Sequence, residues 1–147
     1  MISLLDVNVL IPLLWADHSH HKTAQKWFAA NASDGWATCA FTQASFVRII
    51  SNPTFSTDAP NPAEAADLLE EFLHSPKHEF WSCGLSFAEA IRSFRKSFSG
   101  HLQATDIYLL ALAMHNKGCL VTFDKAIASL LPDEKSRARH IITLPAH

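Results

Sequence analysis

The chain has 147 residues, of which 48% are hydrophobic and 18% are charged, and its formal net charge is −2. This length and composition suit one globular domain, and no apolar stretch approaches the ~20 residues that a transmembrane helix needs. The slightly negative charge excludes a protein that binds nucleic acid through an overall basic surface.

The first residues lack the basic segment of a signal peptide, and an aspartate interrupts them early. Three cysteines, Cys39, Cys83 and Cys119, each fall in or beside a predicted strand. An odd, widely spaced set is typical of small buried side chains in a reducing compartment rather than of disulfides or a zinc site. We therefore expect a cytoplasmic protein without a membrane segment.

Strand and helix patterns alternate along the chain. We predict strands at 2–5, 36–39, 79–83, 119–123 and 139–144, and helices at 7–13, 19–31, 42–51, 61–74, 86–98, 105–116 and 125–131. Alternating strands and helices imply a parallel sheet that is covered on both faces and joined by right-handed crossovers. The predicted fold class is therefore α/β: a three-layer α/β/α sandwich around a mainly parallel five-stranded sheet, as one domain over residues 1–147.

Capping residues mark several predicted helix ends. Asn61 and Thr42 are expected N-caps, and Ser86 opens a capping-box pattern with the glutamate three residues later. Gly118 is the expected C-cap of the helix at 105–116. These signals fix the approximate limits of the helices.

Acidic residues stand where several elements meet one edge of the predicted sheet. Asp6 ends the first strand and Asp124 follows the fourth, while Asp106 opens the helix before the fourth strand. Gln43 opens the helix after the second strand and is expected at the same edge. A ligand crevice of an open α/β sheet lies outside the carboxyl ends of its strands. For Asp6 alone, a plain helix N-cap is an open alternative.

Three carboxylates that lie close together repel one another, and a divalent cation relieves this repulsion. Oxygen ligands favour Mg²⁺ or Mn²⁺ over zinc, and such an ion can bind phosphate and lower the pKa of an attacking water. This chemistry suits hydrolysis of a phosphodiester. The sequence holds neither a glycine-rich phosphate loop nor a G-x-S-x-G motif.

The Asp-Val-Asn sequence at 6–8, Asp106 with the apolar helix that follows it, and the Thr-Phe-Asp sequence at 122–124 resemble the motifs of the PIN domain. More narrowly, the chain resembles a VapC-type toxin of a bacterial toxin–antitoxin pair, over nearly its whole length. The resemblance implies a Mg²⁺- or Mn²⁺-dependent endoribonuclease that is restrained by an antitoxin protein. It also implies a homodimer.

The resemblance further implies that Asp6, Asp106 and Asp124 bind the metal and carry catalysis. Asn8 and Thr122 match motif positions near the site and are expected to orient carboxylates or water; a helix-start hydrogen bond and a plain strand-end residue are the alternatives. Many relatives carry a glutamate where this chain has Gln43, which leaves the number of metal ions open.

The segment between Glu89 and Asp106 carries several basic residues and no acidic one. This segment is either a solvated face or a contact to the RNA backbone. Arg48 has a long side chain that could also reach the site. The possible RNA-binding residues are thus Arg48, Arg92, Arg95, Lys96 and His101. A cluster of His18, His20 and His21 is predicted to be an exposed helix start rather than a metal site.

Two other functions remain open from the residues. One is a phosphohydrolase that forms an aspartyl-phosphate on Asp6, although such enzymes usually carry a second acid where this chain has Asn8. The other is a non-catalytic module that binds RNA or protein, which Gln43 favours. Metal-stimulated cleavage of RNA would distinguish the ribonuclease from both.

Overall fold

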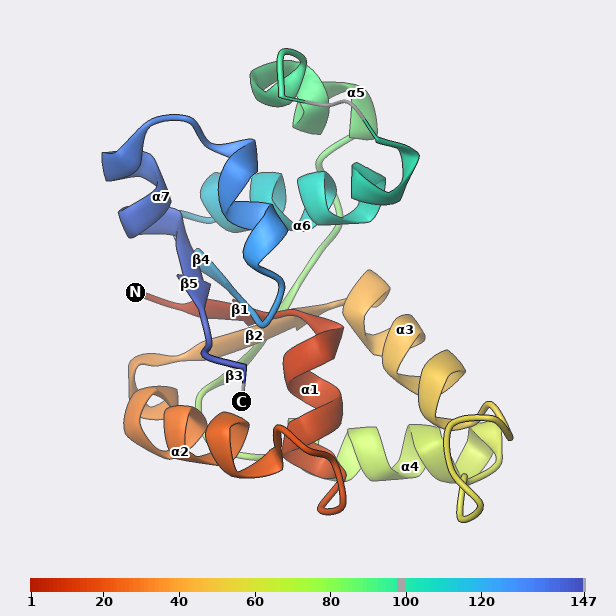
Figure 1. Ribbon diagram of the computed structural model, residues 1–147. Helices are drawn as coiled ribbons and strands as arrows, with labels where there is room; N and C mark the ends of the chain where they lie inside the picture. Colours follow the sequence, from red (N-terminus) through yellow and green to blue (C-terminus); the bar gives the residue numbers. More distant parts are fainter. Residues whose placement is uncertain (98–99, 147) are drawn as a thin grey trace.

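The computed structural model of the chain describes residues 1–97 and 100–146. Five strands form one sheet in which every neighbouring pair is parallel, in the order β3-β2-β1-β4-β5 (Figure 1). The strands are β1 (Ser3–Leu5), β2 (Trp36–Cys39), β3 (His78–Trp81), β4 (Cys119–Thr122) and β5 (Ile141–Thr143). Successive strands are added on one side of β1 and then on the other. The crevice between the carboxyl ends of β1 and β4 is therefore the topological switch point of the sheet.

Helices cover both faces of the sheet (Figure 1). On one face lie α1 (Val7–Leu14), α2 (His21–Asn31), α3 (Ala40–Ile50) and α4 (Pro62–Leu73), and on the other lie α5 (Phe87–Ile91), α6 (Ala104–His115) and α7 (Glu134–His140). Short 3₁₀ helices span Ala32–Asp34, Arg92–Phe94, His101–Gln103 and Lys125–Leu130. The predicted three-layer α/β/α sandwich is confirmed.

Two apolar cores lie on opposite faces of the sheet. Leu4 packs into the core under α6, and its neighbour Leu5 packs into the core under α1. Consecutive strand residues point to opposite faces, so a strand covered on both sides is mostly apolar. The three buried polar side chains of the central strands, Ser3, Thr38 and Thr122, are each hydrogen-bonded.

The end of α6 differs from the prediction. Lys117, rather than Gly118, takes the left-handed conformation (φ 58°), and the N–H of Gly118 donates to the carbonyl of Ala113, as in a Schellman motif. Gly118 is required for a different reason. A Cβ there would stand 2.4 Å from the carbonyl oxygen of Ile2 and 2.7 Å from the ring of Trp81.

Other boundaries also differ. The helix predicted at 86–98 ends at Ile91 and gives way to a 3₁₀ turn, which brings Phe94 into the core; residue 98 lies outside the described part of the chain. The strand predicted at 139–144 is only β5, because residues 134–140 form α7. That helix has no buried residue, so it leaves no apolar period in the sequence. Asn61 caps α4 as predicted.

Helix α3 begins two residues earlier than predicted. Thr42 lies in its first turn, not at its N-cap, and its hydroxyl oxygen accepts a hydrogen bond of 3.0 Å from the backbone N–H of Cys39. The three cysteines are free thiols. Within the described ranges, no helix is long and apolar enough to cross a bilayer.

Candidate active site

Asp6 lies at the switch point, directly after β1, and only 5% of it is exposed. It occupies the N-cap position of α1, but its carboxylate makes no capping hydrogen bond. Instead its Oδ2 accepts a hydrogen bond of 2.8 Å from the hydroxyl of Thr122, at the end of β4. Burial raises the pKa of Asp6, and the Thr122 hydroxyl and the nearby N–H groups at the start of α1 oppose part of this rise. The side chain of Asp6 is thus bonded to the end of β4 rather than acting as a helix cap.

Thr122 connects the residues of both motifs. While its hydroxyl donates to Asp6, its oxygen accepts from the side-chain amide of Asn8 and from the backbone N–H of Asp124, each at 3.0 Å. Asn8 in turn accepts from the backbone N–H of Phe123 at 3.0 Å. These bonds use the whole capacity of the fully buried hydroxyl. They fix β4 to the start of α1, and of the two side chains only that of Thr122 contacts the Asp6 carboxylate directly.

Asp106 and Asp6 line the same small cleft, of about 200 Å³. Asp106 lies half-buried in the first turn of α6, which runs back from the carboxyl edge of the sheet. Burial raises its pKa to about 6, and the negative charges of Asp6 and Asp124 contribute to the rise. No basic group is among the causes that set the pKa of either acid in the cleft. The raised pKa values show that burial and mutual repulsion outweigh any attraction from nearby positive charge.

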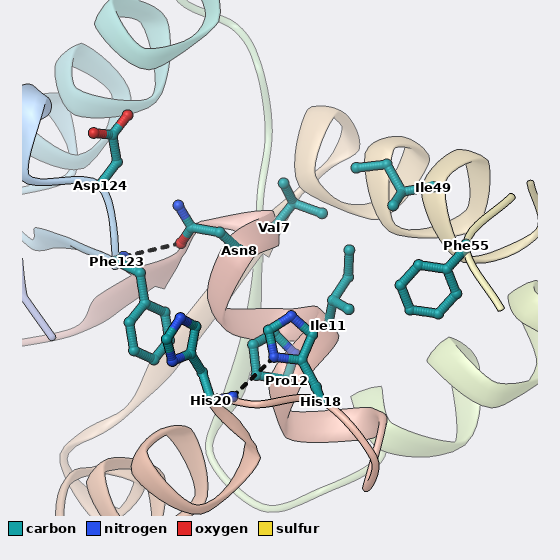
Figure 2. Close-up of a pocket in the computed structure, with 10 residues that line it drawn as sticks. All are labelled: Val7, Asn8, Ile11, Pro12, His18, His20, Ile49, Phe55, Phe123 and Asp124. Carbon is teal, nitrogen blue, oxygen red and sulfur yellow. Dashed lines mark hydrogen bonds between the residues drawn. The ribbon is translucent and has the colours of Figure 1, made fainter. Parts of the chain in front are cut away.

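Asp124 is exposed and stands at the rim of the site. One of its carboxylate oxygens accepts a hydrogen bond of 2.9 Å from the N–H of Ala126 and so caps the 3₁₀ helix that follows. Figure 2 shows its carboxylate directed away from Asn8. Within residues 1–97 and 100–146, no three His, Cys, Asp or Glu side chains are grouped closely enough to hold one metal ion. Asp124 therefore raises the pKa of Asp106 through its charge, but it does not form a preorganised set of metal ligands with Asp6 and Asp106.

The donor set fits Mg²⁺ or Mn²⁺. Two carboxylates line one cleft, their pKa values are raised, and every polar side chain around them except Arg48 offers oxygen. Mg²⁺ usually binds one or two carboxylates and retains several waters, so two acids with a third at the rim suffice for it. A zinc ion would require His or Cys ligands, which do not line this cleft.

The structure does not bring Gln43 to this cleft. Its amide donates to the hydroxyl of Thr38 at 2.9 Å, and its side chain lines a separate hollow between α3 and α4. The cleft is lined instead by Thr42, Ser45 and Arg48, at successive spacings of three residues along α3. That spacing places the three side chains on one face of the helix. The same spacing, read from the sequence, could have identified Thr42 and Ser45 as cleft residues together with Arg48. Arg48 does reach the site.

The other basic residues of the candidate RNA surface lie apart from the cleft. Arg92, Arg95, Lys96 and His101 are exposed, and none of them lines the cleft that holds Asp6 and Asp106. Their contact with RNA stays a prediction. Thr105, just before Asp106, is a further cleft residue that was not singled out from the sequence.

Comparison with known proteins gives consistent matches. The chain matches the family model described as "PIN domain" over residues 3–130. It is 44% identical over 147 residues to Ribonuclease VapC44 of Mycobacterium tuberculosis (strain CDC 1551 / Oshkosh), with 98% of this chain and 100% of that protein covered. It is 42% identical over 128 residues to Ribonuclease VapC39 of the same strain, with 87% and 92% covered. The crystal structure of VapBC2 from Rickettsia felis, bound to a promoter DNA fragment, shares the fold, with a TM-score of 0.66 at 13% identity over 99% of this chain and 100% of that one.

Proposed function

Because this chain belongs to the PIN domain family, we propose that it is a metal-dependent endoribonuclease of the VapC kind, the toxin of a toxin–antitoxin pair, which hydrolyses RNA phosphodiester bonds. The observation that carries the proposal is the pair of carboxylates with raised pKa values, Asp6 and Asp106, in one cleft at the switch point of the sheet. The curated relatives named as ribonucleases match over nearly the whole chain, which supports the substrate class.

We assign Asp6, Asp106 and Asp124 as the acids that hold the metal, with Asp124 acting from the rim. A bound Mg²⁺ or Mn²⁺ supplies positive charge to the phosphate and lowers the pKa of water. Thr122 keeps Asp6 in one orientation through its 2.8 Å hydrogen bond, and Asn8 keeps Thr122 in place. Placement by such fixed bonds removes the need to reorder the carboxylate when RNA binds.

Arg48 is the basic residue best placed to bind the substrate. It is exposed and lines the same cleft as Asp6 and Asp106. A guanidinium there can donate charge-assisted hydrogen bonds to a phosphate oxygen while the carboxylates remain free of ion pairs. We expect Arg48 to position the RNA backbone rather than to take part in proton transfer.

We propose an antitoxin protein as the partner that restrains this activity, since the relatives carry VapC names and the fold is shared with VapBC2. A homodimer is proposed on the same family grounds. We place the protein in the cytoplasm, which the three free thiols support.

The test is cleavage of mixed RNA by the purified protein, with and without Mn²⁺, for the wild type and for Asp6→Asn. We expect Mn²⁺-dependent cleavage that the substitution abolishes while the circular dichroism spectrum stays unchanged. Asp67→Asn, which alters an exposed carboxylate on α4, is the matched control and should cleave as the wild type does. Cleavage that survives in Asp6→Asn would refute the assignment, and RNA binding without any cleavage would favour a non-catalytic module.

A further inference from the structure

A second hollow, of about 580 Å³, adjoins the acidic site (Figure 2). It lies between α1, the loop after α1, the end of α3 and the residues that follow β4. Asn8 and Asp124, which belong to the network around Asp6, stand on its edge. Its lining residues are Val7, Asn8, Ile11, Pro12, His18, His20, Ile49, Phe55, Phe123 and Asp124. A group bound there would be continuous with a phosphate held at the carboxylates.

Flat aromatic rings form opposite walls of this pocket. The imidazole of His20 stacks on Phe123, with ring centroids 4.6 Å apart and an angle of 16° between the planes. Phe55 lies across the pocket, as Figure 2 shows, and the ring of Trp15 contacts it in an edge-to-face arrangement at 5.1 Å. Rings held in this way offer faces on which another planar group can stack. Aliphatic side chains complete the walls.

The polar groups of the pocket suit a neutral ligand. His18 accepts a hydrogen bond from the backbone N–H of His20 at its Nδ1, so the proton of the neutral ring lies on Nε2. Burial lowers the pKa of His18, and the neighbouring His20 and His21 lower it further, so the uncharged form of the ring is favoured. Asn8 gives one amide proton to Thr122 and retains the other. Asp124 at the edge repels an anion, so a phosphate does not belong here.

We propose that this pocket binds one unpaired base of the RNA, next to the phosphodiester that is cleaved. Single-stranded RNA is recognised in this way, by stacking of a splayed base on aromatic side chains and by hydrogen bonds to the edge of the base. An apolar pocket with a few polar groups at fixed positions is the usual form of a small-ligand site. The proposal rests on the proposed ribonuclease function, and it adds a site that selects the base at one position beside the cut.

The binding test does not depend on cleavage. The imidazole signals of His18 and His20 are followed by NMR during titration of the metal-free protein with adenosine, guanosine, cytidine and uridine, and with inorganic phosphate. We expect saturable shifts with at least one nucleoside and none with phosphate. Phe55→Leu keeps an apolar side chain but removes the ring, and it should weaken nucleoside binding at least about fivefold, the lower end of measured base–aromatic stacking.

Phe87→Leu changes an exposed phenylalanine on α5, outside both hollows, and is the matched control with unchanged binding. Absence of shifts with all four nucleosides, or equal shifts with inorganic phosphate, would overturn the proposal. Unchanged affinity in Phe55→Leu would also overturn it, since the aromatic wall would then contribute nothing.

The second arm is cleavage of a randomised RNA, with the ends of the fragments sequenced. The wild type should prefer one base at a fixed position beside the cut, and His18→Ala and Phe55→Leu should relax that preference while the metal dependence persists. An unchanged preference in both variants would refute the base pocket but leave the ribonuclease function standing. If the wild type binds nucleosides but cuts no RNA, the proposed ribonuclease function fails instead, and the pocket's place beside a cut fails with it.

Discussion

Replacing Asp106 with Asn is expected to stabilise the metal-free protein while it abolishes cleavage. In the folded protein the pKa of Asp106 is raised from 3.8 to about 6 by burial and by the charges of Asp6 and Asp124. Between these two pH values the folded state binds more protons than the unfolded chain, so the free energy of unfolding falls as the pH rises from 3.8 towards 6. Above pH 6 the ionised carboxylate is a net cost to the fold.

The size of this cost follows from the same shift. A rise from 3.8 to about 6 corresponds to about 3 kcal/mol of unfolding free energy. Because Asp106 is only half-buried, water screens part of the repulsion, and we expect about 1–2 kcal/mol to remain. Asparagine has nearly the same shape as aspartate and carries no charge, so the variant should recover this amount.

The assay is urea unfolding in the presence of EDTA, at pH 8 and at pH 4, for the wild type and Asp106→Asn. The variant should be more stable by about 1–2 kcal/mol at pH 8 and nearly equal to the wild type at pH 4, where Asp106 is largely protonated. Asp67→Asn, on the exposed face of α4, controls for the general effect of removing one negative charge. Equal stabilisation at both pH values would mean that helix propensity, not ionisation, is responsible, and no stabilisation at pH 8 would refute the reasoning.

Three further outcomes can be measured. Mn²⁺ at a hundred times its dissociation constant should stabilise the wild type by about 2.7 kcal/mol in thermal or urea unfolding. The same Mn²⁺ concentration should stabilise Asp6→Asn much less. It should also stabilise the wild type less below about pH 6, where Asp106 takes up a proton. Thr122→Val removes the hydroxyl that donates to the buried Asp6 carboxylate, so it should lower the free energy of unfolding by about 2–3 kcal/mol and abolish most of the activity. Thr122→Ser should retain both the stability and the activity; equal loss in the two variants would contradict the hydroxyl's role. Gly118→Ala should lower the free energy of unfolding in urea by about 2–3 kcal/mol. Gly84→Ala should change it almost not at all, because the nearest atom to a Cβ at Gly84 lies 3.8 Å away.

The sheet and the positions of Asp6 and Asp106 could be predicted because each depends on where an element ends. An apolar strand that is followed by an acid places that acid at the carboxyl edge, whatever the exact packing. The family resemblance drawn from these residues is confirmed by the match over residues 3–130. The prediction for Gln43 was wrong for the opposite reason, since it depended on the direction of a side chain within a helix. A displacement of one residue along a helix turns a side chain by about 100°, so Thr42 faces the cleft and Gln43 faces Thr38.

Features without an apolar period were also missed. Helix α7 buries none of its residues, so only the cap by Asp133, which accepts from Ser136 at 3.0 Å, marked its start. The pocket beside the acids was missed because its aromatic walls come from segments far apart in sequence. His20 and Phe123 stack across more than a hundred residues, and a single sequence gives no sign of such pairs.

Thr122 shows why the acidic site lies at this point of the fold. A carboxylate as buried as Asp6 needs a donor, and a basic side chain would neutralise the charge that a cation is expected to balance. A hydroxyl supplies one hydrogen bond and no charge, so it orients the acid and leaves its charge in place. Because β1 and β4 are paired in parallel at the centre of the sheet, the threonine that ends β4 meets the acid that follows β1. The topology of the sheet therefore determines which residue can hold the carboxylate without cancelling it.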